Sequence, residues 1–258
     1  MKPKPIAGVR DPLERSGRGP AISVRIDRKH YRSGSGEPIE ALRDLAFDLP
    51  QGTFTALIGP SGCGKTSTLR ILACLDRDFE GEIAPPLGST RIGYVFQEPR
   101  LLPWRTVEQN IRLALPPERR GIDLDPLLGE LGIADFRSRF PGQLSLGMAR
   151  RAGLARAFAV VPEVLLLDEP FVSLDAATAE RLRGLLVAIW RKDPMTVLLV
   201  THNIREAVSL ADRVVLLSPR PGHVLGTDEL PVARDPASVE RIVADLAARY
   251  PGVVQAVG

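Results

Sequence analysis

A glycine-rich segment in the first third of the chain has the residue types and spacing of a phosphate-binding loop. Residues 59–66 read GPSGCGKT, which matches the pattern G-x-x-x-x-G-K-[ST]. Glycines let backbone N–H groups turn toward a polyphosphate, and a helix that begins at Thr66 directs its positive end at the same anion. The Lys65 ammonium group would reach the β- and γ-phosphates, and the Thr66 hydroxyl would bind Mg²⁺. The residues predicted to surround the phosphates are Gly59, Pro60, Ser61, Gly62, Cys63, Gly64, Lys65, Thr66 and Ser67.

Two adjacent acidic residues follow a short apolar run later in the chain. The run at 164–167 reads VLLL and is followed by Asp168 and Glu169. An acidic residue at the end of a buried strand beside a phosphate loop is placed to hold Mg²⁺ through water. Adjacent side chains diverge, so the two carboxylates are expected to have different roles. We predict that Asp168 serves the metal together with Thr66, and that Glu169 polarises an attacking water as a general base.

Apolar runs separated by helical stretches predict the elements that must position these residues. The run at 54–58 ends at a glycine, as a buried parallel strand before a turn does, and residues 66–75 are expected to form a helix. Such alternation is typical of an α/β domain with a mainly parallel sheet. Further strands are expected at 21–27, 91–96, 164–167, 197–200 and 214–217.

The middle and the end of the chain have helical patterns. Residues 98–161 combine helical periodicity with proline breaks, which predicts a mostly helical insertion between strands. Residues 236–250 fit one amphipathic helix, with Ser238 as the candidate N-cap. The segment after residue 217 is too short for a separate regulatory domain.

The composition is that of an ordinary globular protein. Of the 258 residues, 44% are hydrophobic and 25% charged, and the net charge of +3 is too slight to imply nucleic acid. No apolar run approaches the roughly 18–20 residues of a membrane span, and Met1 leads into no signal-type stretch. The two cysteines form no disulfide framework, which indicates a reducing compartment, and Cys63 is interpreted as a small turn residue without a base to activate it. Residues 1–32 contain nine lysines and arginines against three acids, so we interpret residues 1–20 as a flexible basic arm, either solvated or near anionic lipid headgroups.

A third motif narrows the interpretation. Residues 144–148 read LSLGM and open a stretch that is expected to be helical through Phe158. This Leu-Ser-x-Gly run resembles the signature motif of the ATP-binding subunit of an ABC transporter. The resemblance covers about residues 22–217, and the motifs stand in the family's order. It implies a P-loop NTPase (RecA-like) fold of the α/β class, in which a mainly parallel sheet core carries an antiparallel β part and an inserted helical subdomain.

The resemblance implies ATP and Mg²⁺ as cofactors and a role for each matching residue. Tyr31 would stack on the adenine ring. Gln97 would sense Mg²⁺ and the attacking water, and His202 would hydrogen-bond the γ-phosphate. Gln97 and His202 would therefore join Glu169 in catalysis, and Gln97 would join Thr66 and Asp168 at the metal.

The signature itself would act across a dimer. By the resemblance, Ser145 and Gly147 would contact the γ-phosphate held by a second copy of the chain, and Asp175 would communicate between the two copies. Leu146 replaces a glycine of the common family form and Met148 replaces a glutamine. A leucine would be strained at positive φ, which leaves open a subunit that binds nucleotide without hydrolysing it.

The residues after Gln97 resemble one branch of importers. Residues 97–104 read QEPRLLPW and are followed by VEQNI at 107–111, as in nitrate/sulfonate/taurine importers. In that branch this loop meets the transmembrane permease, and an exposed Trp104 would suit such a contact, although core packing would also suit a tryptophan.

The sequence therefore predicts the ATP-hydrolysing subunit of an importer for a small solute such as nitrate, a sulfonate or taurine. The expected partners are a second copy arranged head-to-tail, the permease subunits and, indirectly, an extracytoplasmic solute-binding protein, with no nucleic acid. The chain would lie at the cytoplasmic face of the membrane, held there by the permease. Alternatives are the ATPase of an exporter and a non-transport ATPase acting on nucleic acid. The expected divisions are an arm at 1–20, an ATPase domain at 21–218 with its helical subdomain at about 98–161, and a one-helix extension at 219–258.

Overall fold

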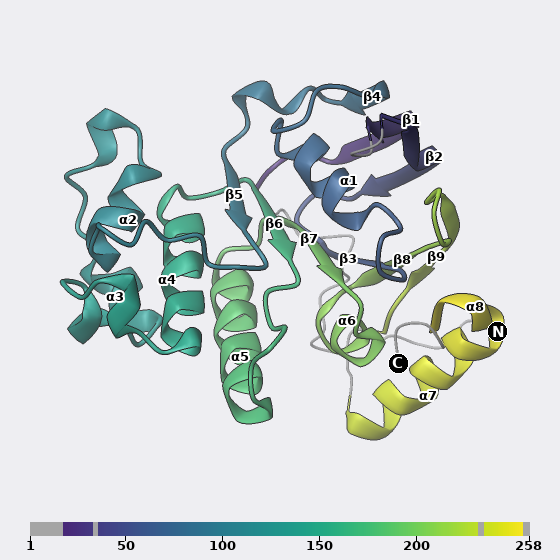
Figure 1. Ribbon diagram of the computed structural model, residues 1–258. Coiled ribbons are helices and arrows are strands. Elements are labelled where there is room, and N and C mark those ends of the chain that lie inside the picture. Colours follow the sequence, from purple (N-terminus) through teal and green to yellow (C-terminus); the bar gives the residue numbers. More distant parts are fainter. Residues whose placement is uncertain (1–17, 33–35, 232–234, 255–258) are drawn as a thin grey trace.

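The computed structural model describes residues 18–32, 36–231 and 235–254. Two lobes are visible in Figure 1: a lobe built on two β-sheets, and a lobe of helices beyond strand β5. The expected basic arm, residues 1–20, lies outside the described residues except for 18–20. Within the described ranges, no helix has both the length and the apolar character needed to cross a membrane.

The larger sheet confirms the expected parallel core. Its six strands run in the order β5-β6-β7-β3-β8-β9, and every pair is parallel except β8 with β9. The final strand, β9, adds an antiparallel edge that the sequence analysis did not include. The strands are β3 (Phe54–Ile58), β5 (Ile92–Val95), β6 (Val164–Asp168), β7 (Thr196–Thr201), β8 (Arg213–Leu217) and β9 (Val224–Glu229).

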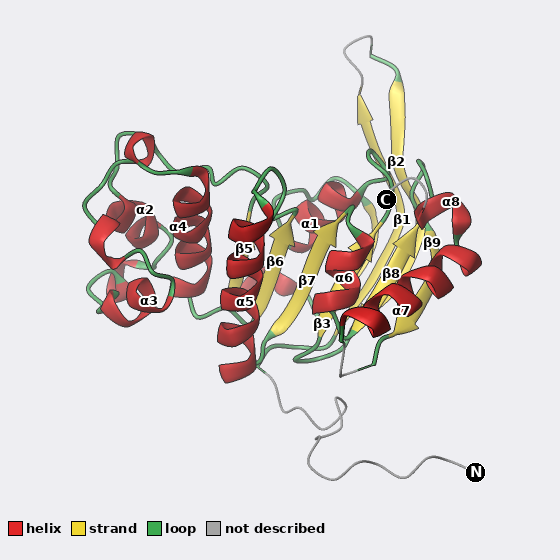
Figure 2. Cartoon of the chain, turned by 90° about the horizontal axis from the view of Figure 1, so that it is seen from below, coloured by secondary structure: helices red, strands yellow, loops and turns green. Residues whose placement is uncertain are grey.

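This sheet separates two hydrophobic cores. All residues of β3, β6 and β7 are buried, as both faces of a covered parallel sheet require. Side chains alternate between faces, so Phe54 belongs to the core shared with helices α5 (Ala176–Lys192) and α6 (Ile204–Leu210), whereas Leu57 belongs to the core under α1 (Lys65–Leu72). Figure 2 shows α5 and α6 in front of the sheet and α1 behind it.

The smaller sheet is antiparallel and has the order β2-β1-β4. Its strands are β1 (Ile22–Arg32), β2 (Pro38–Leu49) and β4 (Glu80–Ala84). The strand expected at 21–27 is the first half of β1, which continues to Arg32, while β2 and β4 were not expected. Pairing of β1 with β2 places Tyr31 opposite Ile39. That register positions an aromatic ring beside the end of the sheet nearest the phosphate loop.

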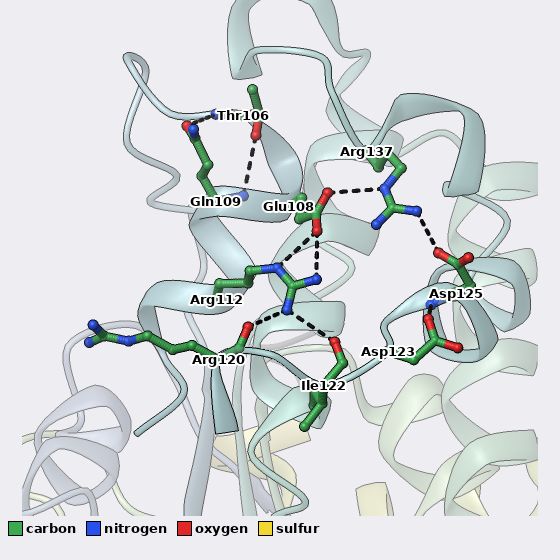
Figure 3. Close-up of polar contacts among 9 residues, drawn as sticks. All are labelled: Thr106, Glu108, Gln109, Arg112, Arg120, Ile122, Asp123, Asp125 and Arg137. Carbon is green, nitrogen blue, oxygen red and sulfur yellow. Dashed lines mark hydrogen bonds and ion pairs between the residues drawn. The ribbon is translucent and has the colours of Figure 1, made fainter. Parts of the chain in front are cut away.

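The helical lobe contains three α-helices: α2 (Val107–Leu113), α3 (Asp125–Glu130) and α4 (Leu146–Ala159). Its polar contacts centre on Glu108 at the start of α2 (Figure 3). Glu108 Oε1 accepts hydrogen bonds from Arg112, and its Oε2 accepts one from Arg137 Nε at 3.0 Å. Arg137 also pairs with Asp125 of α3 at 2.5 Å. The backbone N–H of Glu108 donates to the Arg137 carbonyl at 2.9 Å, so α2 is joined to the segment that leads into α4. Short 3₁₀ turns lie at Leu87–Ser89, Pro117–Arg119, Ala134–Phe136 and Pro141–Gln143.

The segment after β8 holds more than the one helix expected. Besides β9 it contains α7 (Pro236–Arg249) and the short α8 (Pro251–Val254). The N-cap of α7 is Asp235 and not Ser238, because the Asp235 carboxylate accepts the Ser238 N–H at 3.0 Å and the helix begins two residues earlier.

Candidate nucleotide site

A cleft of about 540 Å³ opens where the phosphate loop meets the ends of β1, β6 and β7. It brings together ten of the residues singled out in the sequence, from five separate segments of the chain. Four further lining residues, Ile39, Ala41, Val172 and Arg220, carried no motif signal. The ten residues are Tyr31, Ser61, Gly62, Gly64, Lys65, Thr66, Ser67, Gln97, Glu169 and His202. Gly59, Pro60, Cys63 and Asp168 belong to the same segments but do not line the cleft.

The phosphate loop has the conformation that its glycines permit. Gly64, the N-cap of α1, has φ of 99°, and a Cβ there would lie 2.3 Å from Leu42 Cδ2. Lys65 is 6% exposed, and its Nζ donates to the carbonyls of Gly59 at 2.6 Å and Pro60 at 2.9 Å. The loop thus surrounds a lysine ammonium at the N-terminus of a helix, which is a site for an anion.

Cys63 is the buried side chain of the phosphate loop. Its side chain is fully buried, and burial raises the pKa of its thiol. A raised pKa keeps the thiol protonated, which agrees with the interpretation of Cys63 as a small turn residue and not a nucleophile.

Asp168 and Thr66 meet as oxygen ligands for Mg²⁺ would. The Thr66 hydroxyl lies 3.2 Å from Asp168 Oδ1, and the Tyr94 hydroxyl lies 3.3 Å from Oδ2. Asp168 is 5% exposed, and burial raises the pKa of its carboxyl. A carboxylate and a hydroxyl are hard oxygen donors, and a protein site for Mg²⁺ usually takes one or two of these and completes its shell with water and phosphate. The residues present therefore fit the metal, and Tyr94, which orients the carboxylate, is a residue that no sequence motif indicated.

Glu169 and His202 lie within hydrogen-bond distance at the mouth of the cleft. His202 Nδ1 is 3.0 Å from Glu169 Oε2. Glu169 has φ of 44°, in the left-handed region, and its N–H donates to Val200 O at 2.9 Å. A non-glycine residue held at positive φ is characteristic of functional sites. The turn in the backbone aims the Glu169 carboxylate at the cleft while Asp168 stays buried.

The helical lobe contacts this turn through one buried arginine. Arg150 of α4 is 4% exposed, and it donates to Glu169 O at 3.4 Å and to Val172 O at 3.0 Å. Burial lowers the pKa of its guanidinium. Arg150 therefore links α4 to the segment that carries the general-base candidate, a contact the sequence analysis did not include.

Tyr31 stands at the opposite end of the cleft. Its hydroxyl hydrogen-bonds Ser67 Oγ at 3.0 Å and Asp76 Oδ2 at 3.2 Å. The ring keeps about a third of its surface exposed. These bonds hold the ring edge and leave a face for a planar group to stack on.

The signature residues lie in a second hollow, of about 420 Å³, and not in the first cleft. This hollow contains Ser145, Gly147 and Asp175. Ser145 caps α4 by accepting the Met148 N–H at 3.3 Å, and Asp175 caps α5 by accepting the Thr178 N–H at 2.9 Å, which holds the pKa of the Asp175 carboxyl low. One copy of the chain thus does not bring the signature to its own phosphate loop.

The leucine in the signature is not strained. Leu146 is the first residue of α4 and is absent from the described non-glycine residues with positive φ. Its side chain is 44% exposed. The altered signature therefore keeps a normal helix start. The strain that a leucine at positive φ would cause does not arise.

The loop after Gln97 presents its tryptophan to the surface. Trp104 is 68% exposed, the highest value among the exposed large hydrophobic side chains described. Of the two interpretations left open in the sequence, the structure favours surface contact over core packing. Gln97 itself is exposed at the edge of the cleft.

Comparisons with known proteins agree with this geometry. The ABC transporter family matches residues 42–172. An aliphatic sulfonates import ATP-binding protein SsuB 2 of Pseudomonas syringae pv. tomato is 42% identical over 214 residues, covering 82% of this chain and 87% of the relative. Another SsuB 2, from Pseudomonas aeruginosa, is 44% identical over 227 residues, covering 83% and 90%.

Solved structures extend the agreement to the fold. The dimeric post-hydrolysis state of the ATP-binding cassette MJ0796 bound to ADP and Pi is similar with a TM-score of 0.70 at 30% identity, over 82% of this chain and 100% of that one. From the family match and these relatives, the chain belongs to the ABC transporter family, as one of its ATP-binding cassettes.

Proposed function

We propose that this chain hydrolyses ATP to drive the import of a small sulfonate-type solute. The observation that carries the proposal is the meeting of Lys65, Thr66, Glu169 and His202 in one cleft, with Asp168 held against Thr66. Its relatives are named aliphatic sulfonates import ATP-binding proteins, which favours import over export and favours sulfonates among small anions.

Each motif residue of the site has a task in this proposal. The loop N–H groups and Lys65 bind and orient the phosphates, and Tyr31 stacks on the base. Thr66 and Asp168 would hold Mg²⁺, and the bound ion would supply positive charge beside the phosphoryl oxygens. Glu169 accepts a proton from the attacking water, and His202, 3.0 Å away, fixes the carboxylate and contacts the γ-phosphoryl oxygen. Gln97 would complete the set of Mg²⁺ ligands, on the side of the cleft from which the loop with Trp104 leaves.

Two copies are needed to complete the site. Ser145, Gly147 and Asp175 lie in a hollow of their own, so a head-to-tail dimer would bring them to the partner's ATP. The helix start at Ser145 would then face a phosphate, as the helix start at the phosphate loop does. The dimeric cassettes among the similar structures support this arrangement.

The contacts with the membrane are also proposals. The exposed Trp104 and the proline-containing loop around it would receive the permease, which would hold the chain at the cytoplasmic face of the membrane. A solute-binding protein on the other side of the membrane would select the solute. This chain would then supply energy without contacting the solute.

The substitution Glu169→Gln tests the proposed base. The amide keeps the shape and a hydrogen bond to His202 but accepts no proton, so we expect ATP hydrolysis to fall by at least about 10²-fold while ATP binding persists. Phosphate release by the subunit assembled with its permease gives the rate, and equilibrium binding of ATP gives the affinity. Glu180→Gln, at an exposed position of α5, is the control and should keep the wild-type rate. Unchanged hydrolysis in the Glu169 variant would contradict this role.

A further inference from the structure

One charged residue that lines the nucleotide cleft has no role in the mechanism above. Arg220 is exposed and lines the same cleft as Tyr31, Ile39 and Ala41. Within the described part of the chain its guanidinium makes no hydrogen bond or ion pair. Arg43, on the adjacent strand β2, is by contrast paired with Glu40. An unpaired cation that faces a site for an anionic ligand is available to bind that ligand.

The turn that carries Arg220 is closed by Ser218. Ser218 is 4% exposed, and its N–H donates to His223 O at 2.9 Å. Its hydroxyl oxygen accepts the His223 N–H at 3.0 Å and lies 2.9 Å from Pro219 O and 3.1 Å from Pro221 O. These bonds draw both ends of the 218–223 turn together, so residue 220 is presented at its tip.

The same turn is anchored to the elements that form the cleft. Gly222 N–H donates to Ala41 O at 3.0 Å, and Arg43 N–H donates to Gly222 O at 3.1 Å, which joins the turn to β2. A Cβ at Gly222 would lie 2.0 Å from Cys63 O in the phosphate loop. The turn therefore packs against β2 and the phosphate loop at once, and only glycine allows that approach.

The strands and the turn place Tyr31 and Arg220 on one wall of the cleft. Tyr31 pairs with Ile39, both Ile39 and Ala41 line the cleft, and the Ala41 carbonyl accepts the Gly222 N–H of the turn. The wall of the cleft thus runs from the aromatic ring, over two small or branched apolar side chains, to a guanidinium. A planar base and its sugar would lie along this wall.

We propose that Arg220 is a nucleotide-binding residue that contacts the part of the molecule shared by ATP and ADP. The guanidinium lies at the end of this wall away from Tyr31 and stabilises the bound nucleotide by stacking or by hydrogen bonds. This inference rests on the proposed function, because it assumes that the cleft binds ATP. It adds to the phosphate loop a second cation that comes from a segment beyond the family's motifs.

Binding to purified chain tests this assignment. We expect Arg220→Ala to weaken ATP and ADP by the same factor, about tenfold, and Arg220→Lys to recover part of the affinity. Fluorescence titration with labelled ATP and ADP measures both constants, and thermal unfolding without nucleotide shows that each variant folds. In hydrolysis assays the alanine variant should raise KM and leave kcat close to the wild-type value.

Arg43→Ala is the matched control. It removes the same charge from the adjacent strand, where the side chain pairs with Glu40 and does not line the cleft, so both affinities should stay within about twofold of wild type. Arg220→Ala with unchanged affinity, or with a loss confined to ATP, would overturn the assignment. Wild-type chain that binds no ATP would instead overturn the proposed function and, with it, this inference.

Discussion

The sheet lobe and the helical lobe hold their polar residues by different means. In the sheet lobe, Asp168 ends the buried strand β6, Glu169 follows it, and Lys65 begins the helix after the loop that follows β3, so the parallel register brings them to one edge. In the helical lobe, Glu108, Arg112 and Arg137 are partly exposed and hold one another through ion pairs. The first arrangement is set by the buried backbone, and the second by side chains in contact with solvent.

This difference places the reacting residues on the more rigid lobe and the surface contacts on the more adjustable one. Residues that must meet a phosphate within fractions of an ångström stand on the part of the fold with the least freedom to move. The signature and the loop with Trp104 belong to a lobe whose polar links are worth little individually. Substitutions in the two lobes should therefore differ in what they affect, ATP hydrolysis or unfolding free energy, as well as in the size of the effect.

The largest effect is expected at Lys65 in the sheet lobe. Lys65→Ala removes a buried ammonium group that reaches the phosphates, so hydrolysis should fall by at least about 10²-fold and ATP binding should weaken. Phosphate release and ATP titration measure the two effects. Lys192→Ala, at an exposed lysine of α5, serves as control and should leave both unchanged. Normal hydrolysis in the Lys65 variant would show that the cleft is not the reaction site.

An intermediate effect is expected at Arg150, which connects the lobes. Arg150→Met keeps length and apolar contacts but leaves the Val172 carbonyl without its donor and removes one of two donors to the Glu169 carbonyl, which costs about 1–3 kcal/mol of unfolding free energy. Hydrolysis should also fall, because the turn that carries Glu169 loses its support.

Urea denaturation and phosphate release measure the two losses. The exposed Arg191 of α5 provides the control Arg191→Met, which should change neither. A loss of stability without a loss of hydrolysis would mean that the two lobes are coupled less closely than the contact implies.

The smallest effect is expected in the network around Glu108. Hydrogen bonds from Arg137, with Arg112 in support, hold the pKa of Glu108 below its usual range. Its stabilising contribution is therefore present above the pKa of the unfolded chain and is lost as pH falls through the lower folded value. Glu108→Gln should cost about 1 kcal/mol at neutral pH and little in acid.

Urea denaturation of wild type and variant at pH 7 and pH 3 measures how far the difference in unfolding free energy shrinks in acid. Arg112→Met in the same background shows how much of the cost belongs to that one pair. A cost that does not change with pH would assign the effect to packing and not to the ion pairs.

The sequence predicted the parallel strands of the sheet lobe better than the antiparallel strands β2, β4 and β9. Runs such as VLLL before Asp168 are apolar on both faces, a pattern that favours a covered parallel strand. Strand β2 reads PIEALRDLAFDL, a composition that suits a helix equally well, and its pairing with β1 decides the outcome. Local propensity therefore could not have revealed it.

The site residues divide in the same way. Lys65, Asp168, Glu169 and His202 follow motifs, and their meeting follows from the ends of parallel strands. Tyr94, Arg150 and Arg220 enter through tertiary contacts between segments far apart in the chain, for which one sequence carries no local signal. The separation of Ser145 and Asp175 from the cleft likewise depends on how the helical lobe stands beside the sheet.

The burial of β3 has a consequence for how the protein exchanges hydrogen with solvent. This strand is central in the sheet, is buried at all five residues and runs directly into the phosphate loop. Its amides should exchange only when the whole lobe unfolds, whereas amides of α2 and α3 should exchange by local opening. Nucleotide would then change exchange little in β3 and clearly in the phosphate loop and the helical lobe. The loop would thus stand on the slowest-exchanging strand of the molecule, and the most readily opened helices would lie in the other lobe.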